Sequence, residues 1–271
     1  MEDIGFLHPS SFSNMDWIAE LTRREFQLRP KLPTPPDQSP YHLHKGSIPV
    51  LLSASHSTYH MRNGKWKFSE AFSAGFAQLV AEQTGAFAFY PRFAQADDPN
   101  FSAESPYKDA LKQIIQQHNI RFVLDIHGCL NRHGIGLALG TINGRSCPMV
   151  EPTLNAVLIE QGWQRLQPVE VAQLNKLHPY HFVINLPKFA GGVRQHTVTR
   201  FVSETLGVEA AQLEICSTMR VPIERWKNNQ FEGDKQGIAR TLQMLVVAIR
   251  KIPYAVRQPP VVAAPRPHAN Y

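Results

Sequence analysis

The stretch Arg121-Phe-Val-Leu-Asp-Ile-His-Gly128 determines the fold that we expect for this chain. Its apolar residues form a compact run bounded by a glycine, which is typical of a strand covered on both faces. Asp125 and His127 alternate out of that run at its end. Ligand sites in open α/β sheets gather at the carboxyl ends of strands. The pair therefore indicates either a metal ligand with its orienting partner or a histidine that only bonds locally.

Strand and helix patterns alternate on both sides of this stretch. Strands are expected at residues 48–55, 86–90, 121–127, 134–140, 182–186 and 211–216. Helices are expected at residues 14–26, 69–85, 105–119, 150–161, 197–206 and 234–251. Such alternation indicates parallel strands joined by right-handed crossovers. We predict an α/β fold with a mostly parallel, mixed sheet flanked by helices.

The predicted α/β domain covers residues 48–252. Residues 1–47 form an N-terminal arm, whose connector Arg29-Pro-Lys-Leu-Pro-Thr-Pro-Pro-Asp-Gln-Ser-Pro40 is too rich in proline for a helix or a central strand. Residues 253–271 are again proline-rich and have no pattern that could bury a core, so we expect a disordered tail.

The composition of the chain favours some classes of protein over others. A hydrophobic content of 43% with 18% charged residues is typical of a soluble globular protein. No apolar run reaches a membrane span, and the start of the chain has no secretory signal pattern. Three widely spaced cysteines favour reduced thiols, hence a cytoplasmic location. The net charge of +6 comes from scattered Lys and Arg residues, which argues against nucleic acid and suits an anionic small substrate.

Two histidines, His56 and His127, stand at the ends of predicted strands. Parallel strands would bring both to one edge of the sheet, where a catalytic zinc ion needs three protein ligands and an open position. Glu70, at the start of the next predicted helix, is our first choice for the third ligand. His60 is the second choice and Asp125 the third, because Asp125 fits better as the partner that orients His127.

One acid and three arginines complete the candidate site. Glu214 interrupts an apolar strand, so it must be paired or must face a cavity, where it would act as general base. An ion pair with Arg220 or Arg194 is an equally simple explanation. Arg194, Arg200 and Arg220 lie near Glu214 in sequence and could hold an anionic substrate, although most arginines are surface residues.

With these residues assembled, the chain resembles the N-formylglutamate amidohydrolase family. The likeness lies in Pro49-Val-Leu-Leu-Ser-Ala-Ser-His56, Arg62-Asn-Gly-Lys65, Ser69-Glu70, Asp98-Pro-Asn100, Ser105-Pro-Tyr-Lys108, Leu124-Asp-Ile-His-Gly128, Gly140-Thr141 and Gln212-Leu-Glu-Ile215. The resemblance implies a zinc-carboxypeptidase-like fold and hydrolysis of an amide, the family's reaction being the release of formate and glutamate from N-formylglutamate.

The resemblance also implies roles for individual residues. His56 and Glu70 correspond to the first histidine and the acid of the metal site, His127 to the second histidine, and Glu214 to the general base. Zinc carboxypeptidases separate the first histidine and the acid by two residues, whereas the gap between His56 and Glu70 is far longer here.

Two alternatives stay open at this point. The first is a related amidohydrolase or peptidase that acts on another acylated or polymeric glutamate. The second is a non-catalytic binding or scaffold protein with a degenerate pocket, which predicts no stoichiometric metal and a partner for the proline-rich tail.

Overall fold

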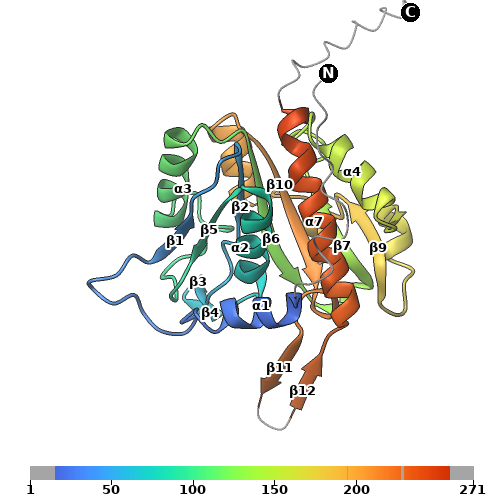
Figure 1. Cartoon of the computed structure of the whole chain (residues 1–271), viewed down its shortest axis with the longest axis horizontal. Helices are drawn as coiled ribbons and strands as arrows, with labels where there is room; N and C mark the ends of the chain where they lie inside the picture. Colours follow the sequence, from blue (N-terminus) through green and yellow to red (C-terminus); the bar gives the residue numbers. More distant parts are fainter. Residues whose placement is uncertain (1–15, 194, 227–228, 257–271) are drawn as a thin grey trace, which may run out of the picture.

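A mixed sheet of eight strands forms the central layer of the computed structural model (Figure 1). The structure describes residues 16–193, 195–226 and 229–256. From one edge of the sheet to the other, the strands are β1 (Tyr41–His44), β5 (Phe87–Pro91), β2 (Val50–Ser53), β6 (Phe122–Cys129), β10 (Glu209–Cys216), β7 (Ile135–Gly140), β9 (His178–Ile184) and β8 (Gln164–Leu166).

The middle of the sheet is parallel. Strands β5, β2, β6 and β10 run in one direction, with each neighbouring pair parallel. Strand β7 is antiparallel to β10, and β9 and β8 follow the direction of β7, while β1 is antiparallel to β5. The predicted α/β class with a mostly parallel, mixed sheet is therefore confirmed.

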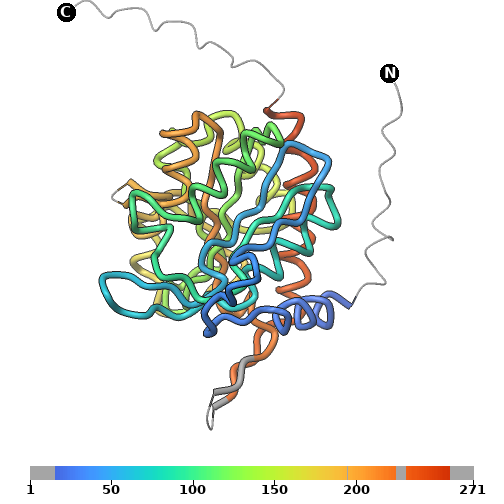
Figure 2. Tube along the Cα trace, turned by 90° about the vertical axis from the view of Figure 1, so that its left-hand side faces the viewer, coloured from blue at the N-terminus to red at the C-terminus, as the bar shows by residue number. Residues whose placement is uncertain are grey.

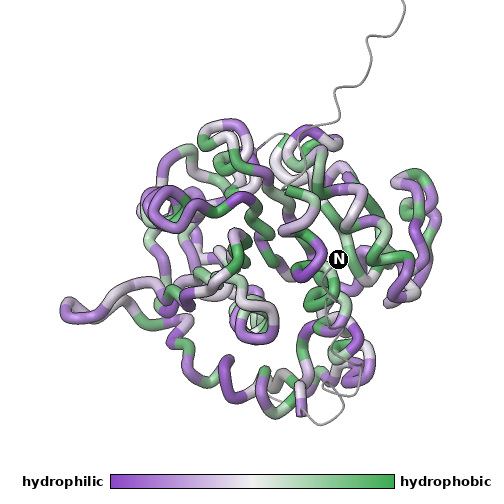
Figure 3. Tube along the Cα trace, turned by 45° about the horizontal axis from the view of Figure 1, so that its top comes forward, coloured by the Kyte–Doolittle hydropathy of each residue, from purple (hydrophilic) through white to green (hydrophobic). Residues whose placement is uncertain are grey.

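Helices cover both faces of the sheet because its central strands bury side chains on both sides. One face packs against α1 (Trp17–Glu25), α2 (Ser73–Thr84), α4 (Glu151–Glu160) and α7 (Lys235–Ala255). The other packs against α3 (Pro106–Gln117) and the continuous helical segment α6 (Val198–Arg200) and η4 (Phe201–Thr205). In β6, Phe122 and Leu124 belong to the first core and Val123 to the second. Hydrophobic residues accordingly gather in the interior (Figure 3).

Several elements were not expected from the sequence. Strand β1 is in the predicted arm, and it extends the sheet at its edge. Two small hairpins were not predicted, β3 (His60–Arg62) with β4 (Lys65–Lys67) and β11 (Ile223–Trp226) with β12 (Asn229–Glu232). Both extend from the same end of the molecule as the carboxyl ends of the central strands (Figures 1 and 2).

Helix boundaries also differ from the sequence prediction. The cap of α1 is Asp16, whose carboxylate accepts the N–H groups of Ile18 and Ala19, whereas the predicted cap, Asn14, lies outside the described residues. Helix α7 continues to Ala255, beyond the predicted start of the tail at residue 253, because Ile252 and Pro253 are still buried. Residues 257–271 of that tail lie outside the described residues. No helix in the described part of the chain has the length and apolar content needed to cross a bilayer.

Gly136 lies in strand β7, where the backbone of the chain packs closely against strand β9. A Cβ atom on Gly136 would lie 1.7 Å from the carbonyl oxygen of Pro179, which is backbone and cannot swing aside. We expect Gly136→Ala to lower the free energy of unfolding by about 3 kcal/mol, measured by urea denaturation. Gly64→Asn is the control, because Gly64 has open space around it and asparagine tolerates its φ of +70°, so a change below about 1 kcal/mol is expected. Equal effects of both variants would contradict the packing argument.

Candidate metal centre

The two strand-end histidines meet at the carboxyl edge of the sheet, as the sequence predicted. Strands β2 and β6 are parallel neighbours in which Ser53 pairs with Asp125, so the chain leaves β2 beside the last residues of β6. His56 follows β2 and His127 lies within the end of β6. Their rings are 4.9 Å apart between centroids and nearly perpendicular, and both side chains are buried.

Glu70 reaches between the two rings. One carboxylate oxygen, Oε1, lies 3.1 Å from Nδ1 of His56, and the other, Oε2, lies 2.8 Å from Nδ1 of His127. The N–H of Gly128 also donates to Oε2, at 2.9 Å, and the N–H of Glu70 itself donates to the carbonyl of His56 at 2.8 Å. The structure thus brings His56, Glu70 and His127 together.

Glu70 is not on a helix, which corrects the predicted local structure. Helix α2 begins at Ser73 rather than after Ser69, and its cap is Phe72 in the left-handed conformation, with φ of 68°. The N–H of Phe72 donates to the carboxylate of Glu25, which ties the turn to α1. Glu70 therefore sits in the turn before the helix, and this turn directs its side chain back to the strand ends.

A buried carboxylate holds the outer nitrogen of each imidazole ring. Nε2 of His56 lies 2.9 Å from Oδ1 of Asp98, and Nε2 of His127 lies 2.7 Å from Oδ2 of Asp125. Such carboxylate–imidazole pairs fix the ring orientation and make a metal ligand more basic. Asp125 therefore lies where we predicted it. Asp98 was missed as an orienting residue, because it belongs to a loop with no periodic pattern.

The centre favours positive charge. Burial on its own would lower the pKa of His56, but the neighbouring carboxylates of Glu70 and Asp98 outweigh it and raise that pKa to about 9. The pKa of His127 is likewise raised well above its usual value, because Asp125 and Glu70 outweigh the effect of burial. Two protonated imidazoles can therefore be replaced by one divalent cation with release of protons.

This donor set fits zinc. The ligand atoms of His56, Glu70 and His127 all lie within 4.8 Å of one another. Two imidazole nitrogens and one carboxylate are a common set for a catalytic zinc ion, which keeps a fourth position for water or substrate. The side chain of Glu70 is 22% exposed, so the group of ligands is not sealed from solvent.

A second set, His56, His60 and Asp98, is also close enough to share an ion. His60 stacks on His56 with 4.0 Å between ring centroids, and its Nε2 lies 3.5 Å from Asp98 Oδ2. The Nε–H of Arg62 donates to that same oxygen at 2.5 Å. A metal ion there would face a guanidinium group directly, so like-charge repulsion disfavours this set. Glu70 and His60 thus belong to two different sets of possible ligands, which share His56.

Glu214 lies beside His127 on the neighbouring strand. The two residues are register partners in β10 and β6, and partners in register project from the same face of the sheet. The Glu214 side chain accepts a hydrogen bond from Nε2 of Gln212 at 2.7 Å. Burial raises the pKa of Glu214 to about 7. A carboxyl group with such a pKa can accept and return a proton near neutral pH.

The structure describes two of the three candidate arginines, and the surroundings of these two differ. Arg220 is buried, lies against Gly128 and donates from Nε to the carbonyl of Ile215, while its Nη1 has no hydrogen-bond partner among the described residues. The ion pairs of the described residues do not include one between Arg220 and Glu214. Arg200 donates to Glu204 at 2.7 Å on the surface. Arg194 lies outside the described residues.

Asp125→Asn tests the role of the orienting carboxylates. An amide cannot support the imidazole of His127 as a carboxylate does, so we expect zinc affinity to fall by about 10- to 100-fold. Competition with a chelator of known affinity would measure it. Ser53→Ala is the control, because it removes a hydroxyl that donates to Asp125 at 2.6 Å and leaves the contact with His127. Unchanged affinity in Asp125→Asn would contradict the assigned role.

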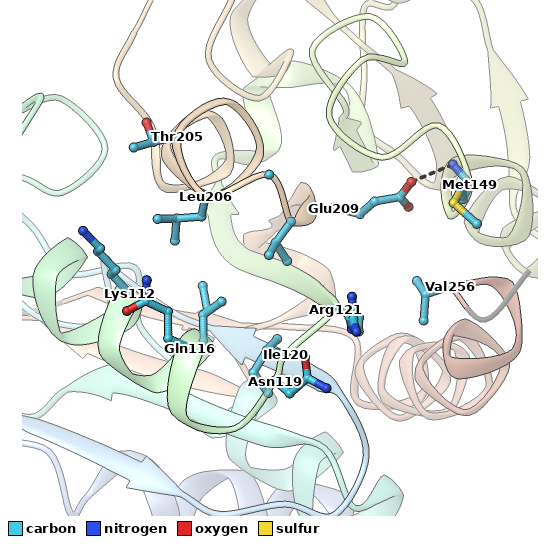
Figure 4. Close-up of a pocket in the computed structure, with 13 residues that line it drawn as sticks. Lys112, Gln116, Asn119, Ile120, Arg121, Met149, Thr205, Leu206, Glu209 and Val256 are labelled. Carbon is cyan, nitrogen blue, oxygen red and sulfur yellow. Dashed lines mark hydrogen bonds between the residues drawn. The ribbon is translucent and has the colours of Figure 1, made fainter. Parts of the chain in front are cut away.

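A large cavity lies away from this centre. Its volume is about 600 Å³, and it opens at the amino edge of the central strands, near Arg121 and the end of α7 (Figure 4). The carboxylate of Glu209, which lines it, already accepts a hydrogen bond from the N–H of Met149 at 3.0 Å. Among the described residues, the proposed ligands, Glu214, Arg200 and Arg220 do not line this cavity, so it is separate from the candidate metal centre.

The chain is similar to known proteins in structure but not in sequence. No family model matches the chain, and no curated protein matches its sequence. A bacteriophage poly-gamma-glutamate hydrolase superposes with a TM-score of 0.47 and 12% identity, over 83% of this chain and 94% of its own. A putative carboxypeptidase A of Shewanella denitrificans gives 0.45 and 9%, over 88% and 68%. A metallo-carboxypeptidase of Pseudomonas aeruginosa gives 0.41 and 12%, over 89% and 69%. At such low similarity these structures carry no argument about chemistry, which rests on the geometry above.

Proposed function

We propose that this protein is a metal-dependent hydrolase that cleaves an amide bond, with zinc held by His56, Glu70 and His127. One observation carries the proposal. Two imidazole Nδ1 atoms converge on a carboxylate at the carboxyl edge of a parallel sheet, and a buried aspartate holds the far nitrogen of each ring. A purely structural role would not require two histidines, each bonded to its own aspartate, on opposite sides of one glutamate.

Two residues near the proposed ligands, Glu214 and Arg220, have separate roles in the proposed reaction. Zinc, when bound, supplies positive charge that polarises a carbonyl group and makes a water molecule more acidic. Glu214 takes the proton from the attacking water and returns it to the leaving nitrogen. Arg220 offers a guanidinium whose Nη1 lacks a partner among the described residues, and it stabilises negative charge that develops on the carbonyl oxygen.

The substrate that we propose is an N-acylated amino acid such as N-formyl-L-glutamate. The sequence motifs that resemble the amidohydrolase family support this choice, and so does the basic character of the chain, with a net charge of +6. A related reaction on another glutamate-containing amide or peptide is the alternative. The three cysteines are free and buried, which suits the proposed cytoplasmic location.

Zinc content and hydrolysis together test the proposal. The protein would be purified without a histidine tag, analysed for metals and assayed against N-formyl and N-acetyl derivatives of glutamate, glutamine and leucine. We expect about one zinc ion per chain and release of the free amino acid. Chelation would abolish the activity and added zinc would restore it. A protein that takes up no zinc and hydrolyses none of these amides would instead favour the scaffold interpretation.

A further inference from the structure

The β3–β4 hairpin places a group of cations next to the proposed metal centre. Its register pairs His60 with Lys67 and Arg62 with Lys65, and residues directly opposite in antiparallel strands share a face. That face is the one directed at Asp98, since both His60 and Arg62 approach this carboxylate. Lys65 and Lys67 on the same face are exposed. On this face the three cations Arg62, Lys65 and Lys67 accompany one carboxylate, that of Asp98. The hairpin therefore has a net positive charge beside the site.

Arg62 is fixed in place by two contacts. Its Nε donates to Oδ2 of Asp98 at 2.5 Å, and its guanidinium carbon lies 5.4 Å from the ring centre of Phe101. Asp98 uses its other oxygen for His56, so one carboxylate joins Arg62 to a proposed metal ligand. The side chain of Arg62 is 28% exposed, and among the described residues Nε is its only hydrogen-bonded nitrogen. The two Nη groups are therefore held in a defined plane and remain free for another acceptor.

We propose that Arg62 is the specificity-determining residue that receives the side-chain carboxylate of an acidic substrate, while Lys65 and Lys67 attract that substrate to the site. A planar guanidinium matches a carboxylate with two parallel hydrogen bonds. This inference rests on the proposed hydrolase function, and it assigns the role to a residue other than Arg194, Arg200 and Arg220, the arginines that the sequence had suggested.

Arg200 and Arg220, the two earlier candidates that the structure describes, are less suited to this role. Arg200 is already paired with Glu204 on the surface. Arg220 is only 5% exposed, packs against Gly128 and has been assigned to the carbonyl oxygen, so it is not available for the substrate side chain. Arg62 combines a fixed orientation with an open side, which is what selective binding of a carboxylate requires.

The test compares N-acetyl-L-glutamate with N-acetyl-L-glutamine, which differ in one charge and have nearly the same shape. In the zinc-loaded wild type we expect kcat/KM to favour the glutamate derivative by about 10- to 100-fold. Arg62→Gln should bring this ratio close to unity, mainly by raising KM for the acidic substrate. Arg62→Lys keeps a positive charge beside Asp98 but loses the planar fork, so an intermediate ratio is expected. The Lys65→Gln/Lys67→Gln double variant should lower kcat/KM for the acidic substrate at low salt, and added salt should remove the difference.

Arg121→Gln is the matched control, because Arg121 is an exposed arginine at the opposite edge of the sheet, in the separate cavity. It should leave the ratio and the zinc content unchanged. If Arg62→Gln slowed both substrates equally, or lost zinc, the residue would act only through Asp98 and the inference would be overturned. A wild type that hydrolyses both derivatives equally well would also overturn it, while the proposed hydrolase function would stand.

Binding provides a readout that does not depend on turnover. Calorimetric titration with L-glutamate and L-glutamine should show a preference for glutamate in the wild type and in Arg121→Gln, and a reduced preference in Arg62→Gln. Such a result would support the assignment of Arg62 even if the acyl group of the true substrate differs from acetyl. Equal binding of both amino acids by the wild type would count against it.

Discussion

His127→Ala is expected to abolish both zinc binding and hydrolysis. The variant removes one of three proposed ligands, and it leaves Glu70 and Asp125 without the imidazole that lies between them. Loss of a direct ligand should exceed the effect of losing an orienting partner, so we expect zinc affinity to fall by more than about 100-fold. Turnover should fall by at least about 1000-fold, because the electrostatic contribution of the metal is worth several kcal/mol in the transition state. Elemental analysis and the amide assay would be run on the same samples.

His60→Ala is the decisive control for this variant. His60 is as buried as His127 and stacks on His56, but it belongs to the alternative set of ligands with Asp98. If the assignment is right, His60→Ala keeps its zinc and most of its activity. Loss of zinc in His60→Ala together with full zinc in His127→Ala would move the metal to the alternative set. Thermal unfolding of both variants would show whether either change acts through the fold.

The framework of the fold could be predicted because its signals are local. The apolar run 122–126 and the Ser105-Pro106 start of α3 each follow from a few neighbouring residues, and both appear in the structure, with Ser105 capping the helix. Strand β1 could not be predicted, because a short strand at the edge of a sheet carries little periodicity. The β3–β4 hairpin was not predicted either, although Asn63-Gly64, with positive φ at both residues, is the local signal of a two-residue hairpin turn. They form because an edge of the sheet or a neighbouring strand supplies hydrogen-bond partners.

In the candidate site, too, some contacts could be predicted from local sequence and others could not. His56 and His127 could be placed together from the rule that parallel strands end at one edge, and the Asp125 spacing indicated its contact with His127. The contacts of Asp98 and Arg62 depend on how a loop and a hairpin fold over that edge, which no local pattern encodes. Glu70 was selected for a position at the start of a helix that it does not occupy, yet it reaches both histidines from the preceding turn.

Glu214→Gln should separate metal binding from chemistry. The amide has nearly the same shape as the carboxyl group and can still accept the hydrogen bond from Gln212, so the fold and the zinc content should be retained. Glutamine cannot take a proton from water, and loss of a general base lowers turnover by about 100- to 10,000-fold. We expect kcat to fall with little change in KM, because Glu214 acts on the proton being transferred rather than on the bound substrate.

The pH dependence follows from the same residue. Burial raises the pKa of Glu214 to about 7 in the absence of a metal, and a bound cation would favour the carboxylate and lower that pKa. A general base must be deprotonated, so kcat/KM of the wild type should decline as pH falls through a pKa below 7, and Glu214→Gln should lose this acid limb. Glu209→Gln is the control, since Glu209 is an acid on the same strand at the far edge, bonded to Met149. An acid limb that persists unchanged in Glu214→Gln, with turnover near the wild-type value, would assign the base to another group. If Glu214→Gln loses both turnover and the acid limb of the kcat/KM profile but keeps its zinc, Glu214 is the group that transfers the proton.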